Sequence, residues 1–254
     1  MQNVVDSLPV LVFVLGALLE RTAPARDYPP VSRWRLTGLL FFVAGATIAI
    51  STGALLAWGL GEVRLVDASV LGPAQVPVAL LVLTFVQYWM HRAYHASDFL
   101  FRWVHQVHHS AERIDVWTSF FAHPSDMVLQ SVAIGLVSTL LGLDALAAGA
   151  LVGASFFINV FQHLNVRTPR WLGFLVQRPE SHNIHHQRGV HAFNYGDLAI
   201  WDLAFGTYRN PQGPIAVEVG YWRGGSQQIV AMLLGRDVTS PPAAPAAQLD
   251  EARV

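Results

Sequence analysis

The chain has 254 residues and a formal net charge of −1, and 53% of its residues are hydrophobic while only 13% are charged. Soluble domains carry about 25% charged residues, so this composition indicates a membrane protein. The sequence has no cysteine, which excludes disulfides, thiolate metal sites and cysteine nucleophiles, and its near-neutral charge argues against a nucleic-acid partner.

Two apolar segments lie in the N-terminal part of the chain. The first, residues 8–19, follows no basic leader and precedes no small-residue cleavage site, so we do not expect a removed signal peptide. A membrane span needs about 20 apolar residues. Segment 8–19 is shorter and fits either a tilted span or an interfacial helix, whereas residues 36–60 are long enough to cross.

Residues 76–95 and 127–163 supply the other predicted spans, and the second of these is broken near 142–146 into a hairpin of two helices. Four arginines lie between the first two apolar segments: Arg21, Arg26, Arg33 and Arg35. By the positive-inside rule this loop is cytoplasmic, which places the histidine-bearing ends of the later spans on the same side. We therefore expect an all-α, multi-pass integral membrane protein with four to five membrane helices and a cytosolic helical cap.

All eleven histidines lie between residues 91 and 191. The sequence HRAYH (91–95) puts two imidazoles four residues apart, on one face of a helix. The sequences HQVHH (105–109) and HNIHH (182–186) repeat one HxxHH pattern. Polar residues close to a membrane are usually functional, so the clustering predicts a metal site. A catalytic zinc uses about three protein ligands, and eight or nine histidines therefore fit two ions better than one.

Imidazole binds zinc, copper, iron and nickel, and the spacing alone does not distinguish iron from zinc. A pair of redox-active irons beside a membrane suggests oxygen activation against a lipid. A metal transporter would instead carry acidic residues or histidines at mid-depth in its spans, and a bis-histidine haem carrier would leave most of these histidines unused. Both non-catalytic alternatives are less favoured than an enzyme.

The sequence resembles the fatty acid hydroxylase/sterol desaturase superfamily of integral-membrane di-iron enzymes over about residues 76–210. The resemblance rests on HRAYH, HQVHHS, AHPSD, ESHNIHH and NYGDLAIWDLAFGT, in this order. It implies a cytosolic cap that holds two iron ions, with zinc a possible substitute in a purified sample. It also implies hydroxylation of an unactivated C–H bond of a lipid (fatty acyl, sterol or related), with dioxygen and a separate electron-donor protein. Desaturation and ether-lipid cleavage are the alternatives.

Carried over by position, the resemblance implies nine metal ligands and no catalytic residue beyond them: His91, His95, His105, His108, His109, His163, His182, His185 and His186. Some hydroxylases of the superfamily have a histidine where this chain has Asn159, which is expected to bind through water or to leave an open position. His123 and Asp126 are interpreted as supports behind the ligands, although His123 fits a loop residue packed at the cap surface equally well. Asp202 either orients an imidazole or caps a helix, and His191 is expected to be peripheral.

The predicted layout has four parts. Residues 1–75 hold the N-terminal membrane segments and 76–210 form the histidine-box catalytic domain, with spans and cap together. Residues 211–239 form a C-terminal cap segment, in which SQQIVAMLLG is predicted to be a surface helix. Residues 240–254 are rich in proline and alanine and are predicted to be a disordered tail.

Overall fold

The computed structural model describes residues 2–61, 63–190, 192–213 and 215–242, with only the backbone described for 2–8. The described residues form α-helices and short helical turns, and contain no β-strand beyond two isolated bridges. The all-helical class expected from the sequence is therefore confirmed. The long helices are α1 (Gln2–Thr22), α2 (Trp34–Leu60), α3 (Gln75–Ala96), α6 (Pro124–Leu140) and α7 (Ala145–His163).

The remaining helical elements are short. The α-helical ones are α4 (Asp98–Leu100), α5 (Gln106–His109), α8 (Pro179–His185), α9 (Ala199–Phe205) and α10 (Ile229–Leu233). The 3₁₀ turns are η1 (Ala68–Ala74), η3 (Thr118–Phe120), η4 (Arg170–Phe174) and η5 (Gly225–Gln227), and one π-helical turn, η2 (Phe101–His105), leads into α5.

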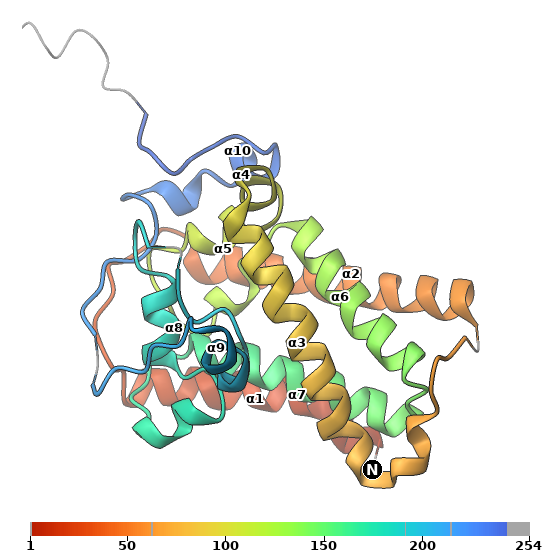
Figure 1. The fold of residues 1–254 in the computed structure, drawn as a ribbon. Helices are drawn as coiled ribbons and strands as arrows, with labels where there is room; N and C mark the ends of the chain where they lie inside the picture. The colour runs from red at the N-terminus through yellow and green to blue at the C-terminus, as the bar shows by residue number, and fades with distance from the viewer. Residues whose placement is uncertain (1, 62, 191, 214, 243–254) are drawn as a thin grey trace, which may run out of the picture.

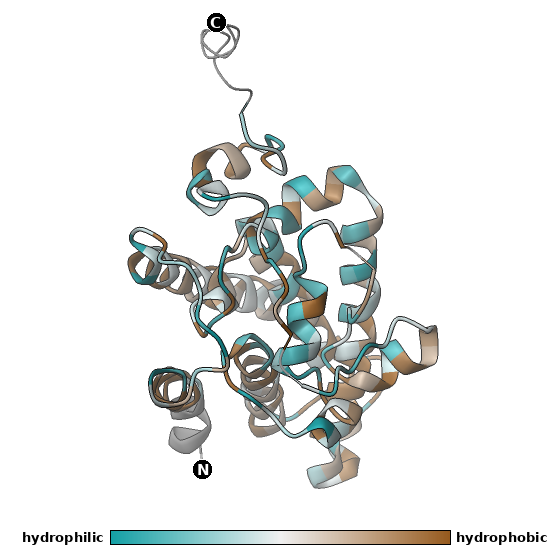
Figure 2. Ribbon diagram, turned by 90° about the vertical axis from the view of Figure 1, so that its left-hand side faces the viewer, coloured by the Kyte–Doolittle hydropathy of each residue, from teal (hydrophilic) through white to brown (hydrophobic). Residues whose placement is uncertain are grey.

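The long helices pack in a bundle. Helix α1 lies along α7, α2 lies along α6, and α3 contacts both α6 and α7. The short helices α4, α5, α8, α9 and α10 gather at the left and top of the view in Figure 1. In Figure 2 hydrophobic residues run along the long helices, while hydrophilic residues concentrate in the short helices and the connecting loops. The fold thus has an apolar bundle with a polar assembly at one side.

Three helical segments of the described chain are long and apolar enough to cross a membrane: Trp34–Leu60, Ala68–Ala96 and Ala145–His163. Their outward faces carry large apolar side chains, such as Ile50 and Trp58 of α2, which are 74% and 86% exposed. Exposed apolar surface of this extent is expected in contact with lipid. Helix α6 is apolar but has 17 residues, and α1 contains Pro9; neither is among the three. The total of four to five spans stays a prediction.

The predicted break in the hairpin lies between α6 and α7. Gly142 has a φ of +61°, a conformation that costs glycine nothing, and an added Cβ would lie 2.8 Å from the carbonyl oxygen of Val66. Asp144 then begins α7, because its side chain accepts a hydrogen bond from the Ala147 N–H at 2.8 Å. The Gly-Leu-Asp sequence therefore stops one helix and starts the next.

An apolar core packs the loop after α5 against the N-terminal helices. The rings of Trp34 and Phe121 stack with centroids 4.2 Å apart, and Phe41 also packs on the Phe121 ring. The Trp34 Nε1–H donates to the carboxylate of Asp115, so this buried indole is also satisfied. The contacts hold the segment that follows the second histidine motif in one position.

The C-terminal segment is only partly the surface helix that the sequence predicts. The turn η5 and the short α10 cover this stretch, with Val230 72% exposed and Met232 fully buried. The Trp222 Nε1–H donates to the Val238 carbonyl oxygen, which docks the segment that follows α10. Of the predicted disordered tail, residues 243–254 lie outside the described part of the chain.

Candidate metal centre

Five helical elements bring the histidine motifs together. Helix α3 carries the HRAYH pair in its last turns, η2 and α5 carry the first HxxHH copy, α7 ends in His163, and α8 with its C-terminal residue carries the second copy. All nine predicted ligands fall into two groups whose ligand nitrogens lie within 4.8 Å of one another. The group of five is His91, His95, His105, His109 and His185; the group of four is His108, His163, His182 and His186.

The two HxxHH copies are divided between the groups in opposite ways. From the first copy, His105 and His109 join the group of five and His108 joins the group of four. From the second copy, His182 and His186 join the group of four, while the remaining histidine joins the group of five. In each copy the i,i+4 pair shares a face of the helix and therefore one group. Each copy thus serves both groups.

The group of four has nitrogen lone pairs that face one another. His108 Nδ1 lies 3.0 Å from the Phe121 carbonyl oxygen, and His163 Nδ1 lies 2.6 Å from that of Asn159. A carbonyl only accepts, so both Nδ1 atoms carry the proton and both Nε2 atoms of the neutral rings carry a lone pair. These two Nε2 atoms are 3.2 Å apart. Two nitrogens that bind one ion at about 2.1 Å lie about 3.0–3.4 Å apart, so a metal ion fits between them.

The group of five shows the same arrangement. His91 Nδ1 lies 2.8 Å from the carbonyl oxygen of Tyr195, and His105 Nδ1 lies 3.3 Å from the Asp126 carboxylate. Both bonds assign the proton to Nδ1, and the two Nε2 atoms face each other at 3.0 Å. Without a shared cation these lone pairs repel. The donor sets of both groups therefore fit bound metal ions.

The three imidazoles of the second HxxHH copy differ in the hydrogen bonds that support them. His185 Nδ1 lies 2.8 Å from the Phe193 carbonyl oxygen. His182 Nε2 lies 3.0 Å from His163 Nε2 and 3.1 Å from His186 Nε2. The Nδ1 atoms of His182 and His186 are buried and have no hydrogen-bond partner within the described ranges. Two rings of the group of four are therefore oriented by packing and by their neighbours alone.

Burial keeps histidines of both HxxHH copies neutral. It lowers the pKa of His108 to about 3, with the neighbouring His105 as the next cause. The pKa values of His109, His182 and His186 also lie well below the usual value, first because of burial and then because of adjacent histidines. Neutral imidazole is the form that binds metals. These imidazoles therefore bind protons weakly and keep their lone pairs available for metal ions.

The NYG turn supports the predicted ligand His91 through a backbone carbonyl. His91 bonds to the carbonyl of Tyr195, and Asp202 accepts from the backbone N–H groups of Tyr195 and Gly196 and from the Thr207 hydroxyl, at 2.9, 2.8 and 2.6 Å. A Cβ on Gly196 would lie 3.0 Å from the Asp202 carboxylate, which explains the glycine. No direct contact between Asp202 and an imidazole is seen in the described chain. Asp202 folds the loop whose carbonyl orients His91.

The remaining predicted residues lie in different positions relative to the two histidine groups. Asn159 lines the cavity beside the group of four, and its Nδ2 donates to the Ser119 carbonyl oxygen at 3.0 Å. His123 is buried at the start of α6, where its Nδ1 accepts from the Ser125 N–H as a helix cap, and it belongs to neither group. The Asp126 carboxylate lies 3.3 Å from His105 Nδ1, so it is placed to support that ring. His191 lies outside the described residues.

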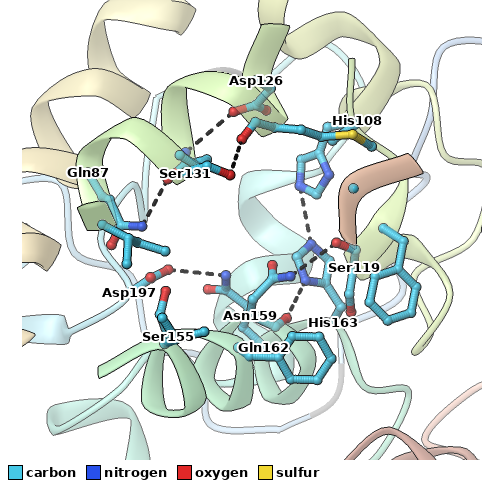
Figure 3. Close-up of a pocket in the computed structure, with 18 of the residues that line it drawn as sticks. Gln87, His108, Ser119, Asp126, Ser131, Ser155, Asn159, Gln162, His163 and Asp197 are labelled. Atoms are coloured by element: carbon cyan, nitrogen blue, oxygen red, sulfur yellow. Dashed lines mark hydrogen bonds between the residues drawn. The ribbon is translucent and has the colours of Figure 1, made fainter. Parts of the chain in front are cut away.

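A cavity of about 830 Å³ connects both histidine groups with the long helices. His91 and His105 line it from the group of five, and His108, His163 and His182 from the group of four; Figure 3 labels His108 and His163. Figure 3 shows that polar side chains surround this end of the cavity. Sequence reasoning did not identify them: Gln87, Ser119, Gln130, Ser155, Gln162 and Asp197. The available signal was weak, since Gln87 is one helical turn before His91 in an otherwise apolar span.

Comparisons with known proteins agree with the motifs. The fatty acid hydroxylase family model matches residues 76–207. An ornithine lipid hydroxylase of Rhizobium tropici is 32% identical over 152 residues, 58% of this chain and 45% of that protein. Sphinganine C4-monooxygenase 1 of Arabidopsis thaliana is 28% identical over 139 residues, 53% of this chain and 54% of its own. A very-long-chain aldehyde decarbonylase of Oryza sativa is 28% identical over 145 residues, again 53% and 54%.

The chain matches about half the length of these curated relatives. No solved structure shows a significant match. The family model, however, covers more than half of the chain and includes all three histidine motifs, the NYG turn and Asp202. The chain therefore belongs to the fatty acid hydroxylase family, within the fatty acid hydroxylase/sterol desaturase superfamily.

Proposed function

We propose that the protein is a membrane-bound di-iron oxygenase that hydroxylates an unactivated C–H bond of a lipid. The observation that carries the proposal is the pair of facing imidazole groups at the polar end of a cavity that continues among the apolar helices. The names of two relatives, a lipid hydroxylase and a monooxygenase, favour hydroxylation over desaturation or ether cleavage.

The two histidine groups would each hold one ion, with five and four imidazole ligands respectively. When bound, two iron ions supply the chemistry that side chains lack: activation of dioxygen and removal of hydrogen from carbon. Zinc is accepted by similar imidazole sites, so a purified sample can contain zinc in place of iron. Electrons come from a separate donor protein.

The chain's own residues orient the ligands and shelter the site. Backbone carbonyls and Asp126 hold the rings with Nε2 toward the ions, and such supporting bonds raise ligand basicity. The segment 105–121 is buried on the N-terminal helices, which limits access of water from the cap side. The lipid would enter along the apolar helices and present one carbon at the histidine end.

We further propose that this histidine-bearing cap faces the cytoplasm. Arginines between α1 and α2 support that orientation. Helices α1 and α6 pack on the candidate spans α7 and α2, which supports a membrane bundle of four to five helices. In this arrangement residues 1–75 complete the membrane bundle and residues 76–210 carry the catalytic chemistry.

Labelled dioxygen tests the proposal directly. Membranes that contain the full chain, an electron donor and extracted lipids of the host are incubated with isotopically labelled dioxygen, and lipids are compared by mass spectrometry with those from the His108→Ala variant. We expect a lipid product that carries one labelled oxygen atom and is missing in the variant. An oxygen atom derived from water, or a product that forms without dioxygen, would contradict an oxygenase.

A further inference from the structure

The cavity has two chemically different ends. Farther along the helices from the histidines it is lined by apolar side chains, among them Ile50 of α2, Ile134 of α6 and Val152 of α7. Its histidine end is lined by the polar side chains named above, from α3, η3, α6, α7 and the loop after the NYG turn. A plain hydrocarbon would leave the atoms among them that have no partner in the described chain unsatisfied, and each buried unsatisfied polar group costs about 1–3 kcal/mol. The polar atoms therefore require a polar ligand.

Gln87 lines the cavity and holds at its wall an acceptor that no described residue pairs with. The Asp126 carboxylate only accepts, so Gln130 turns its Nε2 toward it, at 3.4 Å. The Gln130 Oε1 then accepts from Gln87 Nε2 at 2.9 Å. This chain of bonds leaves Gln87 Oε1 buried and with no partner among the residues described. Because Asp126 also binds His105, the same carboxylate orders a metal ligand and the acceptor in the cavity.

Asp197 presents a second acceptor. Its carboxylate lines the cavity and accepts from the Gln162 Nε2 at 3.2 Å. In the part of the chain that is described, no arginine lies within ion-pair distance of it. Burial raises the pKa of Asp197 to about 6. A carboxylate with one amide as its partner has free acceptor positions, and Figure 3 shows it on the cavity wall opposite His108.

Two buried hydroxyl groups complete this end of the cavity. Tyr94 is 4% exposed and Ser119 is 8% exposed, and both line the cavity. The Tyr94 Oη and the Ser119 Oγ have no hydrogen-bond partner in the described ranges. Hydroxyl groups donate and accept, so they adapt to a ligand, whereas Gln87 Oε1 and Asp197 accept from it.

We propose that the histidine end of the cavity binds a hydroxyl or amine group of the lipid substrate, with Gln87 Oε1 and the Asp197 carboxylate as its acceptors. The oxidised carbon then lies beside this polar group and not in the middle of a hydrocarbon chain. The inference rests on the proposed oxygenase function, because it assigns the position of the substrate at that site.

Binding of three matched probes to the full chain, loaded with iron in detergent, tests the inference without turnover. The probes are a long-chain primary alcohol, the corresponding amine, and the corresponding methyl ether, which accepts hydrogen bonds but cannot donate one. A hydrogen bond to a buried acceptor contributes enough to change affinity about tenfold. We expect the alcohol and the amine to bind about tenfold more tightly than the ether.

Variants assign the preference to the two acceptors. Asp197→Ala and Gln87→Leu should each reduce the preference for the alcohol over the ether by about threefold, because one hydroxyl proton is shared between the two acceptors, while Asp197→Asn should lose the preference for the amine more than that for the alcohol. Ser131→Ala is the matched control, because Ser131 lines the same cavity but donates to the Met127 carbonyl oxygen at 2.7 Å within its own helix. It should keep the wild-type ratio.

Metal content, measured on every sample, separates the two proposals. If wild type with two bound metals binds the ether as tightly as the alcohol, the inference is overturned and the oxygenase proposal stands. If Asp197→Ala loses metal, Gln87→Leu decides the test, and an unchanged ratio in that variant overturns the inference. A wild-type chain that binds no metal in ample iron overturns the proposed function itself.

Discussion

The group of five and the group of four differ in how their imidazoles are held from behind. In the group of five, the Nδ1 atoms of His91, His105 and His185 each have an acceptor in a neighbouring element. In the group of four, His108 and His163 have such acceptors, whereas the Nδ1 atoms of His182 and His186 have none within the described chain. Loss of such supporting bonds typically weakens metal binding about 10–100-fold. We therefore expect the ion in the group of five to bind more tightly than its neighbour.

Removing one ligand from each group tests the comparison with the largest effect. For His105→Ala and His186→Ala we expect at most one ion per chain at saturating iron, and product formation reduced at least about a hundredfold. Metal analysis and product assays of the purified variants check this. His191→Ala is the control, since no motif includes it, and should keep both ions. Full turnover in both ligand variants would refute the assignment of these histidines to a redox centre.

Removing one supporting residue should affect one group selectively. Asp126→Ala takes away the acceptor of His105 Nδ1, so the affinity of the group of five should fall about 10–100-fold while the other group keeps its affinity. Titration with a competing chelator measures the two affinities separately. Asp126→Asn retains an acceptor oxygen and should be intermediate. If both ions weaken equally, the support does not act on one group alone.

Acid should destabilise the folded protein and should release the ion of the group of four before that of the group of five. The pKa of His108 is lowered to about 3 and that of His186 lies well below its usual value, both mainly through burial, whereas an unfolded histidine titrates near 6.5. Below about pH 6.5 the unfolded chain therefore binds protons that the folded chain does not. Stability of the metal-free protein is complete above that pH and is lost as the pH falls, by about 1.4 kcal/mol per unit for each such histidine, down to about 3 for His108.

Denaturant titrations of the metal-free protein and metal release from the loaded protein, both as a function of pH, measure this dependence. We expect the loaded protein to lose the ion of the group of four at the higher pH. A metal-free protein whose free energy of unfolding is the same at about pH 7 and about pH 5 would show that these histidines are not buried as neutral rings.

Removal of residues 240–254 should have the smallest effect, because it touches neither group. The cut follows Thr239, so the buried Val238 and the bond from Trp222 to its carbonyl remain. Expression, metal content and activity of the shortened chain should equal those of the full chain. A loss of either ion on truncation would show that the tail docks near the histidine groups.

The sequence could predict what depends on spacing along one helix. The i,i+4 rule places His105 with His109 and His182 with His186, and the structure has both pairs on common groups. The breaks near 142–146 and the apolar stretches likewise correspond to helix ends and long helices. These features follow from local geometry and composition.

What depends on contacts between distant segments was not predictable from the sequence. The supports of His91 and His108 are backbone carbonyls of Tyr195 and Phe121, which leave no side-chain signal. The orientation of Gln87 depends on a chain of bonds through another helix. Asp202 acts on an imidazole only through a folded loop, a possibility that spacing does not suggest.

The opposite division of the two HxxHH copies has a thermodynamic consequence. Each copy contributes nitrogens to both groups, so an ion bound in one group would immobilise segments that an ion in the other group also needs. The conformational entropy of these segments is then lost only with the first ion, so the two binding events favour each other. Linkage makes this effect reciprocal: whatever one ion adds to the affinity of the other, it receives in return. Filling of the centre should therefore be cooperative, with a singly loaded chain scarcer than two independent sites would give.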